Sequence, residues 1–230
     1  MVSRIAILLA ALMVVGGVTQ AATYTKEADA DGTIGISYNS AYSYVNNFGE
    51  NDIRTGWGSY QTRRAIMKFN IDWSGLDVAT AATLQIDVWQ APSGYENQKL
   101  ALVSEDFTGT YPATDYFNRK FGQTWTTAGG SPDTDTEIDV TLVANTSMDI
   151  DVLSLITHWQ GDKTGHFGLI LYDATGPATD NAYSRVRSTE SNDGDPDYYR
   201  HPTLVIVPEP ASLALLAMGG FGLLLRRRRR

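Results

Sequence analysis

Short alternations of apolar and polar residues recur along most of this 230-residue chain. In segment 83–88, for example, Leu84, Ile86 and Val88 are apolar and the residues between them are polar. A period of two places successive side chains on opposite faces of a strand, so each such segment predicts a strand with one buried face. Apolar residues at alternate positions also occur at 65–71, 138–142, 167–171 and 204–206. Clusters of Gly, Asn, Asp, Ser and Pro separate these segments, as they do between the strands of all-β folds.

One segment has helical spacing instead. Four apolar residues at i, i+3, i+4 and i+7 share one helical face: Val152, Leu155, Ile156 and Trp159. Asp151 is the predicted N-cap, and Gly161 is the predicted end of the helix. Together these patterns predict an all-β fold, an antiparallel β-sandwich of jelly-roll type with one short helix packed on an end.

The two ends of the chain have a different pattern. At the N-terminus, Arg4 precedes an apolar run over 5–18 and small residues at 19–21, which is the layout of a secretory signal peptide. Near the C-terminus, Pro208-Glu209-Pro210 precedes a mainly apolar stretch over 211–225 and five arginines at 226–230. The predicted organisation is a signal peptide at 1–22, one domain at 23–207, and a sorting or membrane segment at 208–230.

The order of the C-terminal features resembles the PEP-CTERM sorting signal. This resemblance implies an exosortase-type transpeptidase as a partner, and a location in the envelope, on the outer surface or in the extracellular matrix of a bacterium that makes exopolysaccharide. As a helix the apolar stretch would be about 22 Å long, and snorkelling arginines would let it hold the protein in a membrane before processing. An ordinary C-terminal membrane anchor is the alternative. Whether processing releases or attaches the protein stays open.

Charge excludes one class of partner. Without the two terminal segments the chain keeps 12 basic and 25 acidic residues, a net charge of about −13. Such a surface repels nucleic acid, so no nucleic-acid partner is expected. The chain has no cysteine, so its stability outside the cell must come from core packing and from any bound metal.

A second resemblance extends over nearly all of the 23–207 region. It rests on short motifs in chain order, which include Asn47-Phe48-Gly49, Gly56-Trp57-Gly58, the run 63–71, the run 165–171 and the run 202–206. This succession resembles the DNRLRE domain, an extracellular β-sandwich family that includes alginate-binding modules. The resemblance implies a β-sandwich that binds carbohydrate.

Aromatic side chains could provide such binding, because sugar rings stack their C–H faces on them. The parity of segment 84–88 places Trp89 on the outer face, unless the strand ends at Val88 and the indole folds over the core edge. Loops at the end of a sandwich often form a binding rim, and nearby basic groups could recognise a carboxylated sugar. The predicted binding residues are Trp57, Tyr60, Trp89, Tyr111, Tyr116, Arg119, Lys120 and Trp125.

Calcium is the predicted structural ion, because it prefers carboxylate and carbonyl oxygens gathered by loops. The candidate ligands are Glu27, Asp29, Asp31, Asp193, Asp195 and Asp197. The last three have the spacing that opens an EF-hand loop, but Pro196 interrupts them and Tyr198 stands where that loop has glycine. A further acidic series at 133–139 could equally be a solvated strand edge.

No catalytic motif is recognisable. The three histidines, His158, His166 and His201, lack zinc-ligand spacing, so each is predicted to be packed or on the surface. A glycosidase would need two facing acids, which the sequence alone cannot place. The predicted function is an exported, non-catalytic module that binds carbohydrate or exopolysaccharide matrix. A structural matrix protein without a specific ligand, and a polysaccharide-degrading enzyme, are the alternatives.

Overall fold

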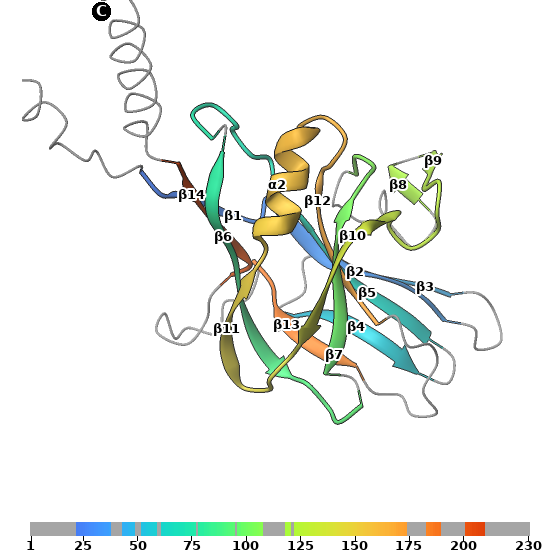
Figure 1. Cartoon of the computed structure of the whole chain (residues 1–230). Helices are drawn as coiled ribbons and strands as arrows, with labels where there is room; N and C mark the ends of the chain where they lie inside the picture. Colours follow the sequence, from blue (N-terminus) through green and yellow to red (C-terminus); the bar gives the residue numbers. More distant parts are fainter. Residues whose placement is uncertain are drawn as a thin grey trace, which may run out of the picture.

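The computed structural model describes residues 22–37, 43–48, 52–58, 61–76, 78–94, 96–107, 118–120, 122–173, 183–189 and 201–209. Within these residues, antiparallel strands and one helix, α2 (Leu153–Gly161), form the fold (Figure 1). The strands are β1 (Tyr24–Glu27), β2 (Ala30–Ser37), β3 (Ser43–Phe48), β4 (Asp52–Gly58), β5 (Gln61–Lys68), β6 (Ala79–Gln90), β7 (Asn97–Val103), β8 (Asn118–Lys120), β9 (Gln123–Thr124), β10 (Pro132–Thr141), β11 (Thr146–Asp151), β12 (Gly168–Tyr172), β13 (Ser184–Arg187) and β14 (Thr203–Pro208).

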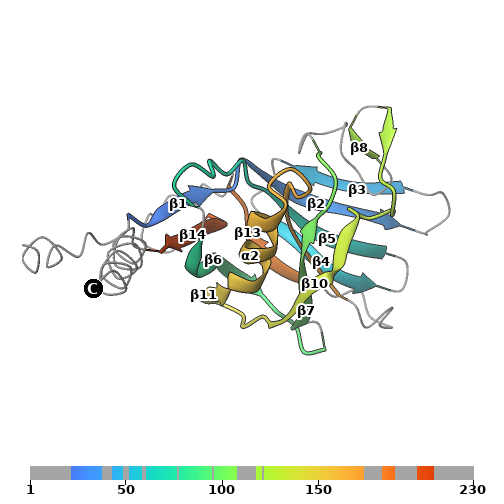
Figure 2. The ribbon, with the colours of Figure 1, turned by 45° about the horizontal axis from the view of Figure 1, so that its top comes forward.

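Twelve of these strands form one curled sheet. Its order is β1-β14-β6-β13-β4-β5-β12-β7-β10, with β11 paired to β6 and with β2 paired to both β3 and β5. Strand β4 is the turning point, because it pairs with β13 near its start and with β5 near its end. Gly56 stands at this change of partner with φ of 134°, a conformation that favours glycine. The sheet bends back on itself, so the predicted all-β, sandwich-like class is confirmed (Figure 2).

The main core fills the space inside the curl. Leu84, Ile86 and Val88 of β6 are all buried and belong to it, as the period of two predicts. Other strands contribute in the same alternating way, with buried residues that include Ala65, Met67, Leu100, Leu102, Val140, Leu169, Leu171, Leu204 and Ile206. The sequence pattern predicts that these residues are buried, because a strand with one buried face turns its alternate apolar residues toward the core.

Helix α2 closes one side of this core, where it contacts β6, β7 and β10 (Figure 1). The four residues of its predicted apolar face are buried, which confirms the helical spacing. Trp159 packs edge-on against Trp73, with 5.8 Å between the ring centroids. The helix begins one residue later than predicted: Val152 is the N-cap, and the Asp151 carboxylate accepts the Leu153 N–H at 2.9 Å.

A second, smaller core lies on the opposite face of β5, β7 and β12. It contains Ile34, Ile66, Ala101, Val103, Phe107, Trp125, Ile170 and Tyr172. Trp125 is only 5% exposed, and its ring centroid lies 5.8 Å from that of Phe107. The prediction that Trp125 lies on an exposed rim is therefore wrong. Its indole is buried in the second core, on a face of the sheet that the alternation of apolar residues did not predict to be buried.

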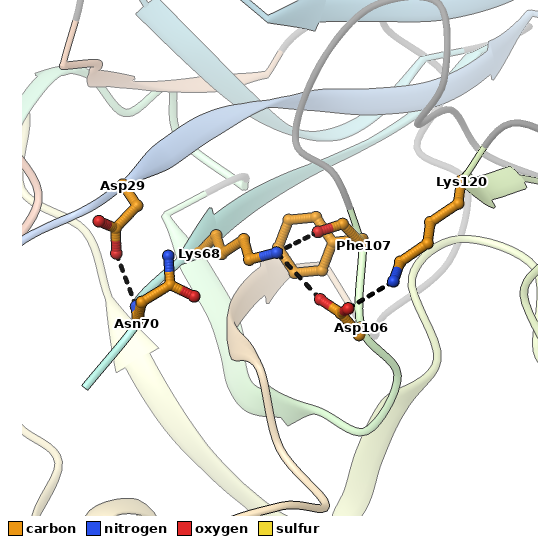
Figure 3. Close-up of polar contacts among 6 residues, drawn as sticks. All are labelled: Asp29, Lys68, Asn70, Asp106, Phe107 and Lys120. Carbon is orange, nitrogen blue, oxygen red and sulfur yellow. Dashed lines mark hydrogen bonds and ion pairs between the residues drawn. The ribbon is translucent and has the colours of Figure 1, made fainter. Parts of the chain in front are cut away.

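A lysine–aspartate clamp ties the segment over this second core to the sheet. Lys68 on β5 donates to Asp106 at 2.9 Å and also to the Phe107 carbonyl, while Lys120 approaches Asp106 from the other side (Figure 3). Burial alone would raise the pKa of Asp106, but hydrogen bonds from Lys120 and Lys68 outweigh this effect and lower it. The charged carboxylate is thus the form that the fold stabilises.

Replacing Asp106 by Asn should lower the free energy of unfolding by about 1 kcal/mol at neutral pH, because a partly exposed ion pair contributes little more. A lowered folded-state pKa stabilises the protein above the ordinary carboxyl pKa of 3.8, and this contribution is lost as the pH falls through the lowered value. The free energies of unfolding of the parent protein and of Asp106→Asn, measured in urea, should therefore become equal in acid. Asp135→Asn on β10 is the control, and equal stability of Asp106→Asn and the parent at pH 7 would contradict the clamp.

Candidate functional site

Trp89 is an exposed aromatic residue near the end of β6. Val88 points into the core, so the period of two turns Trp89 outward, and 43% of it is exposed. Among the described residues, the other exposed large apolar side chains are Val78 and Val143, neither of which is aromatic. Of the two orientations that the sequence left open for Trp89, the structure therefore has the outward one, and the indole does not fold over the core edge.

Two arginines of the neighbouring strand flank this indole. Strand β13 pairs with β6, with a register shift between Arg185 and Val186. The guanidinium carbons of Arg185 and Arg187 lie 5.0 Å and 4.9 Å from the centroid of the Trp89 ring. Both distances fall within the range of cation–π attraction. The contacts restrict the indole while its exposed part stays open to solvent.

A second aromatic ring extends the cluster. The guanidinium carbons of Arg63, Arg185 and Arg54 lie 4.2, 5.3 and 5.4 Å from the centroid of the Tyr183 ring. Burial alone would raise the pKa of the Tyr183 hydroxyl, but the charges of these arginines outweigh it and lower the pKa. The pKa of Arg63 is itself lowered, chiefly by burial. These three guanidinium groups thus favour the anionic form of the Tyr183 hydroxyl.

Asp52 orients part of the cluster. Its Oδ2 atom lies 2.8 Å from Nε of Arg54 and 3.8 Å from Nε of Arg185, and Oδ1 accepts from Nη2 of Arg54 at 3.3 Å. Strands β4 and β13 pair Arg54 with Arg185 directly, so one carboxylate reaches both. We define the arginine–aromatic surface as Trp89, Tyr183, Arg54, Arg63, Arg185 and Arg187. It holds four of the seven arginines between residues 23 and 207.

Of the other predicted binding residues, the two whose side chains the structure describes do not join this surface. The other five, or their side chains, lie outside the described part of the chain: Trp57, Tyr60, Tyr111, Tyr116 and Arg119. Lys120 belongs to the clamp on Asp106, and Trp125 lies in the second core. Sequence reasoning missed the arginines of β13. The signal was present, since Ser184-Arg185-Val186-Arg187 alternates an outward arginine with an inward residue.

The N-terminal acids predicted to bind calcium are not gathered at one point among the described residues. Asp29 pairs with Lys26, whereas Asp31 is buried and accepts the Thr189 N–H at 2.9 Å. Glu27 lies on the exposed side of β1. The three carboxylates have separate partners, and calcium at these residues stays a prediction. The other candidate ligands lie outside the described residues, and calcium there stays a prediction: Asp193, Asp195 and Asp197.

The predicted sorting motif begins inside the sheet. Pro208 is the last residue of β14, is buried, and lies opposite Ala79 of β6. The Glu209 N–H donates to the Val78 carbonyl at 2.8 Å, while Pro210 lies outside the described residues. The folded region thus continues two residues past the predicted boundary at 207. No helix in the described ranges has the length and hydrophobicity to cross a membrane, and the 211–225 stretch lies outside them.

Comparison with known families identifies one part of the chain. The model of the PEP-CTERM protein-sorting motif matches residues 207–230. No family model supports the resemblance of the 23–207 region to the DNRLRE domain, and no curated protein matches the chain. The sorting motif implies recognition by an exosortase. The chain therefore carries the PEP-CTERM sorting signal of an exported protein directed to the cell surface.

Proposed function

We propose that the exported domain is a non-catalytic module that binds an acidic polysaccharide of the cell-surface matrix through the arginine–aromatic surface. The observation that carries this proposal is the exposed Trp89 ring, with the guanidinium carbons of Arg185 and Arg187 both within 5.0 Å of its centroid. An exposed indole can stack on the C–H face of a sugar ring. Two guanidinium groups beside it can bind the carboxylate of the same or the next sugar.

The choice of an acidic polymer follows from the residue types. Arginine presents a planar fork of N–H donors that matches a carboxylate in two parallel hydrogen bonds, whereas lysine presents a point charge. All four basic residues of the surface are arginines. The rest of the domain is acidic, so a polyanion would be repelled elsewhere and bound at this surface. Electrostatics would thereby fix the position of the polymer.

Two further considerations support a surface polysaccharide as the ligand. A protein sorted to the cell surface would meet the exopolysaccharide that the PEP-CTERM signal implies for its cell. The resemblance to DNRLRE domains, which no family model supports, would imply the same class of polymer. An acidic matrix polysaccharide therefore fits both the location and the surface chemistry.

Trp89→Ala tests this function. Titration calorimetry of the full-length protein in mild detergent with a polyuronate oligosaccharide should show binding, and the variant should bind at least about tenfold more weakly, about 1.4 kcal/mol. The loss is expected because the stacking platform disappears while the fold stays intact. A neutral glucan oligosaccharide of equal length should bind much more weakly to either protein.

Val143→Ala is the matched control, because it removes an exposed apolar side chain outside the arginine–aromatic surface. It should leave polyuronate affinity unchanged. Equal affinity of Trp89→Ala and the parent protein would remove Trp89 from the binding surface. A folded protein that binds no polysaccharide at all would favour a structural matrix protein without a specific ligand.

A further inference from the structure

A second cluster of polar side chains lies where α2 meets β10 and the residues before β12. His158 is on the last turn of α2, Asp133 is at the start of β10, and His166 stands two residues before β12. The two imidazole centroids are 5.1 Å apart, and Nε2 of His158 lies 3.6 Å from Oδ2 of Asp133. One potential ligand atom from each residue lies within 4.8 Å of the other two. In the described part of the chain, this is the one such group of three or more His, Cys, Asp or Glu residues.

His166 is the buried member of the cluster. It is 7% exposed, and its Nδ1 atom is buried without a hydrogen-bond partner. A buried polar atom in this state costs about 1–3 kcal/mol, and such atoms often mark an ion or water site. The side chain of His158, by contrast, is 49% exposed, so solvent reaches the cluster from that side. The His166 imidazole is thus buried in the fold, and the His158 imidazole lies on the solvent-exposed side of the cluster.

Asp133 is oriented for ligation. Its Oδ1 atom accepts the Asp135 N–H at 3.1 Å, and Oδ2 faces His158. A hydrogen bond to one carboxylate oxygen is the usual way in which a protein fixes a ligating carboxylate from outside the metal shell. The free rotation of the carboxyl group is therefore already restricted before any ion binds.

We propose that Asp133, His158 and His166 bind a divalent transition-metal ion, with Zn²⁺ as the best match. Two imidazoles and one carboxylate are a zinc-type ligand set, whereas Ca²⁺ and Mg²⁺ select oxygen ligands. In a tetrahedral zinc site the ligand atoms are about 3.3–3.6 Å apart, given metal–ligand distances of ~2.0–2.2 Å. The 3.6 Å between His158 and Asp133 already fits such a site, and the other ligand-atom separations, all within 4.8 Å, would have to shorten on binding. Water would complete the fourth position.

The ion would connect three separate parts of the fold: α2, β10 and the residues before β12. A chain without cysteine has no disulfide to make such a connection. A metal that binds only the folded state raises stability in proportion to the logarithm of its concentration. The proposed ion would thus stabilise the position of α2, the helix that closes the main core. The proposed site is independent of the proposed polysaccharide surface.

The test is zinc titration of the full-length protein, purified without a histidine tag and treated with chelator. Calorimetry should show one Zn²⁺ per chain, and Zn²⁺ should raise the melting temperature. His158→Ala and Asp133→Asn should each weaken binding at least about tenfold and abolish the thermal shift, because each removes one of three ligands. His158 is half exposed, so its replacement should not unfold the protein.

His201→Ala is the control for a histidine near an acid. His201 lies 3.8 Å from Glu27 and outside the cluster, so this variant should bind Zn²⁺ like the parent protein. Bound Co²⁺ should give a visible absorption band in the parent and in His201→Ala, and none in His158→Ala. The absence of Zn²⁺ binding below millimolar concentration, or equal binding by His158→Ala and the parent, would overturn the proposal.

Discussion

Replacing Trp159 by alanine is expected to lower the free energy of unfolding by about 3–5 kcal/mol, the range for a large buried aromatic side chain. The indole is buried on the inner face of α2 and packs edge-on against Trp73. Alanine would leave a cavity where the helix closes the main core. Because a domain of this size is stable by only ~5–15 kcal/mol, this one change would remove much of its stability.

Urea unfolding followed by far-ultraviolet circular dichroism measures this loss. Thr157→Ala is the matched control, since Thr157 lies on the exposed face of the same helix and its replacement should change stability by less than about 0.5 kcal/mol. A loss below about 1 kcal/mol for Trp159→Ala would show that α2 does not close the core in the way that the structure describes.

The double substitution Arg185→Gln with Arg187→Gln should weaken polyuronate binding by about 100-fold or more, about 2.7 kcal/mol. Both guanidinium groups flank Trp89, so the substitution removes two charged donors and the contacts that restrict the indole. Glutamine keeps some length and polarity but carries no charge. Calorimetric titration at low and at moderate salt should show the salt dependence of binding decrease as well, because fewer ionic contacts form.

A control with the same net charge separates a local from a long-range effect. Lys99→Gln with Lys163→Gln also removes two positive charges, but neither residue belongs to the arginine–aromatic surface. This control should retain affinity within about threefold of the parent protein. An equal loss in both double variants would mean that overall charge, and no particular surface, governs polyuronate binding.

Much of the fold was predictable because one buried face leaves a period-two signature. Leu84, Ile86 and Val88 follow that signature, and Trp89 is therefore placed outward by the same rule. The second core was not predictable in this way. Ala65, Ile66 and Met67 are apolar in succession because β5 is buried on both faces, and a continuous apolar run does not say which residue faces which core.

The candidate sites depended on contacts between residues distant in sequence. Asp133 is 25 residues from His158, so no local spacing could show that the sheet brings the two together. The arginines of β4 and β13 likewise meet only because these strands pair. Strand parity indicated an exposed indole as one of two orientations, and the continuation of β6 past Val88 decides between them. Sequence reasoning missed the arginines around the indole, since those depend on strand order.

We propose above that an acidic polysaccharide lies on Trp89. The most direct test of this contact is the ¹⁵N–¹H spectrum of the tryptophan side chains, recorded during titration with a polyuronate oligosaccharide. The Trp89 signal can be assigned from the Trp89→Phe variant. We predict that the Trp89 indole signal shifts with the binding curve, while those of the buried Trp125 and Trp159 stay in place. Saturable binding with an unshifted Trp89 signal would contradict the claim, because the polymer would then lie elsewhere.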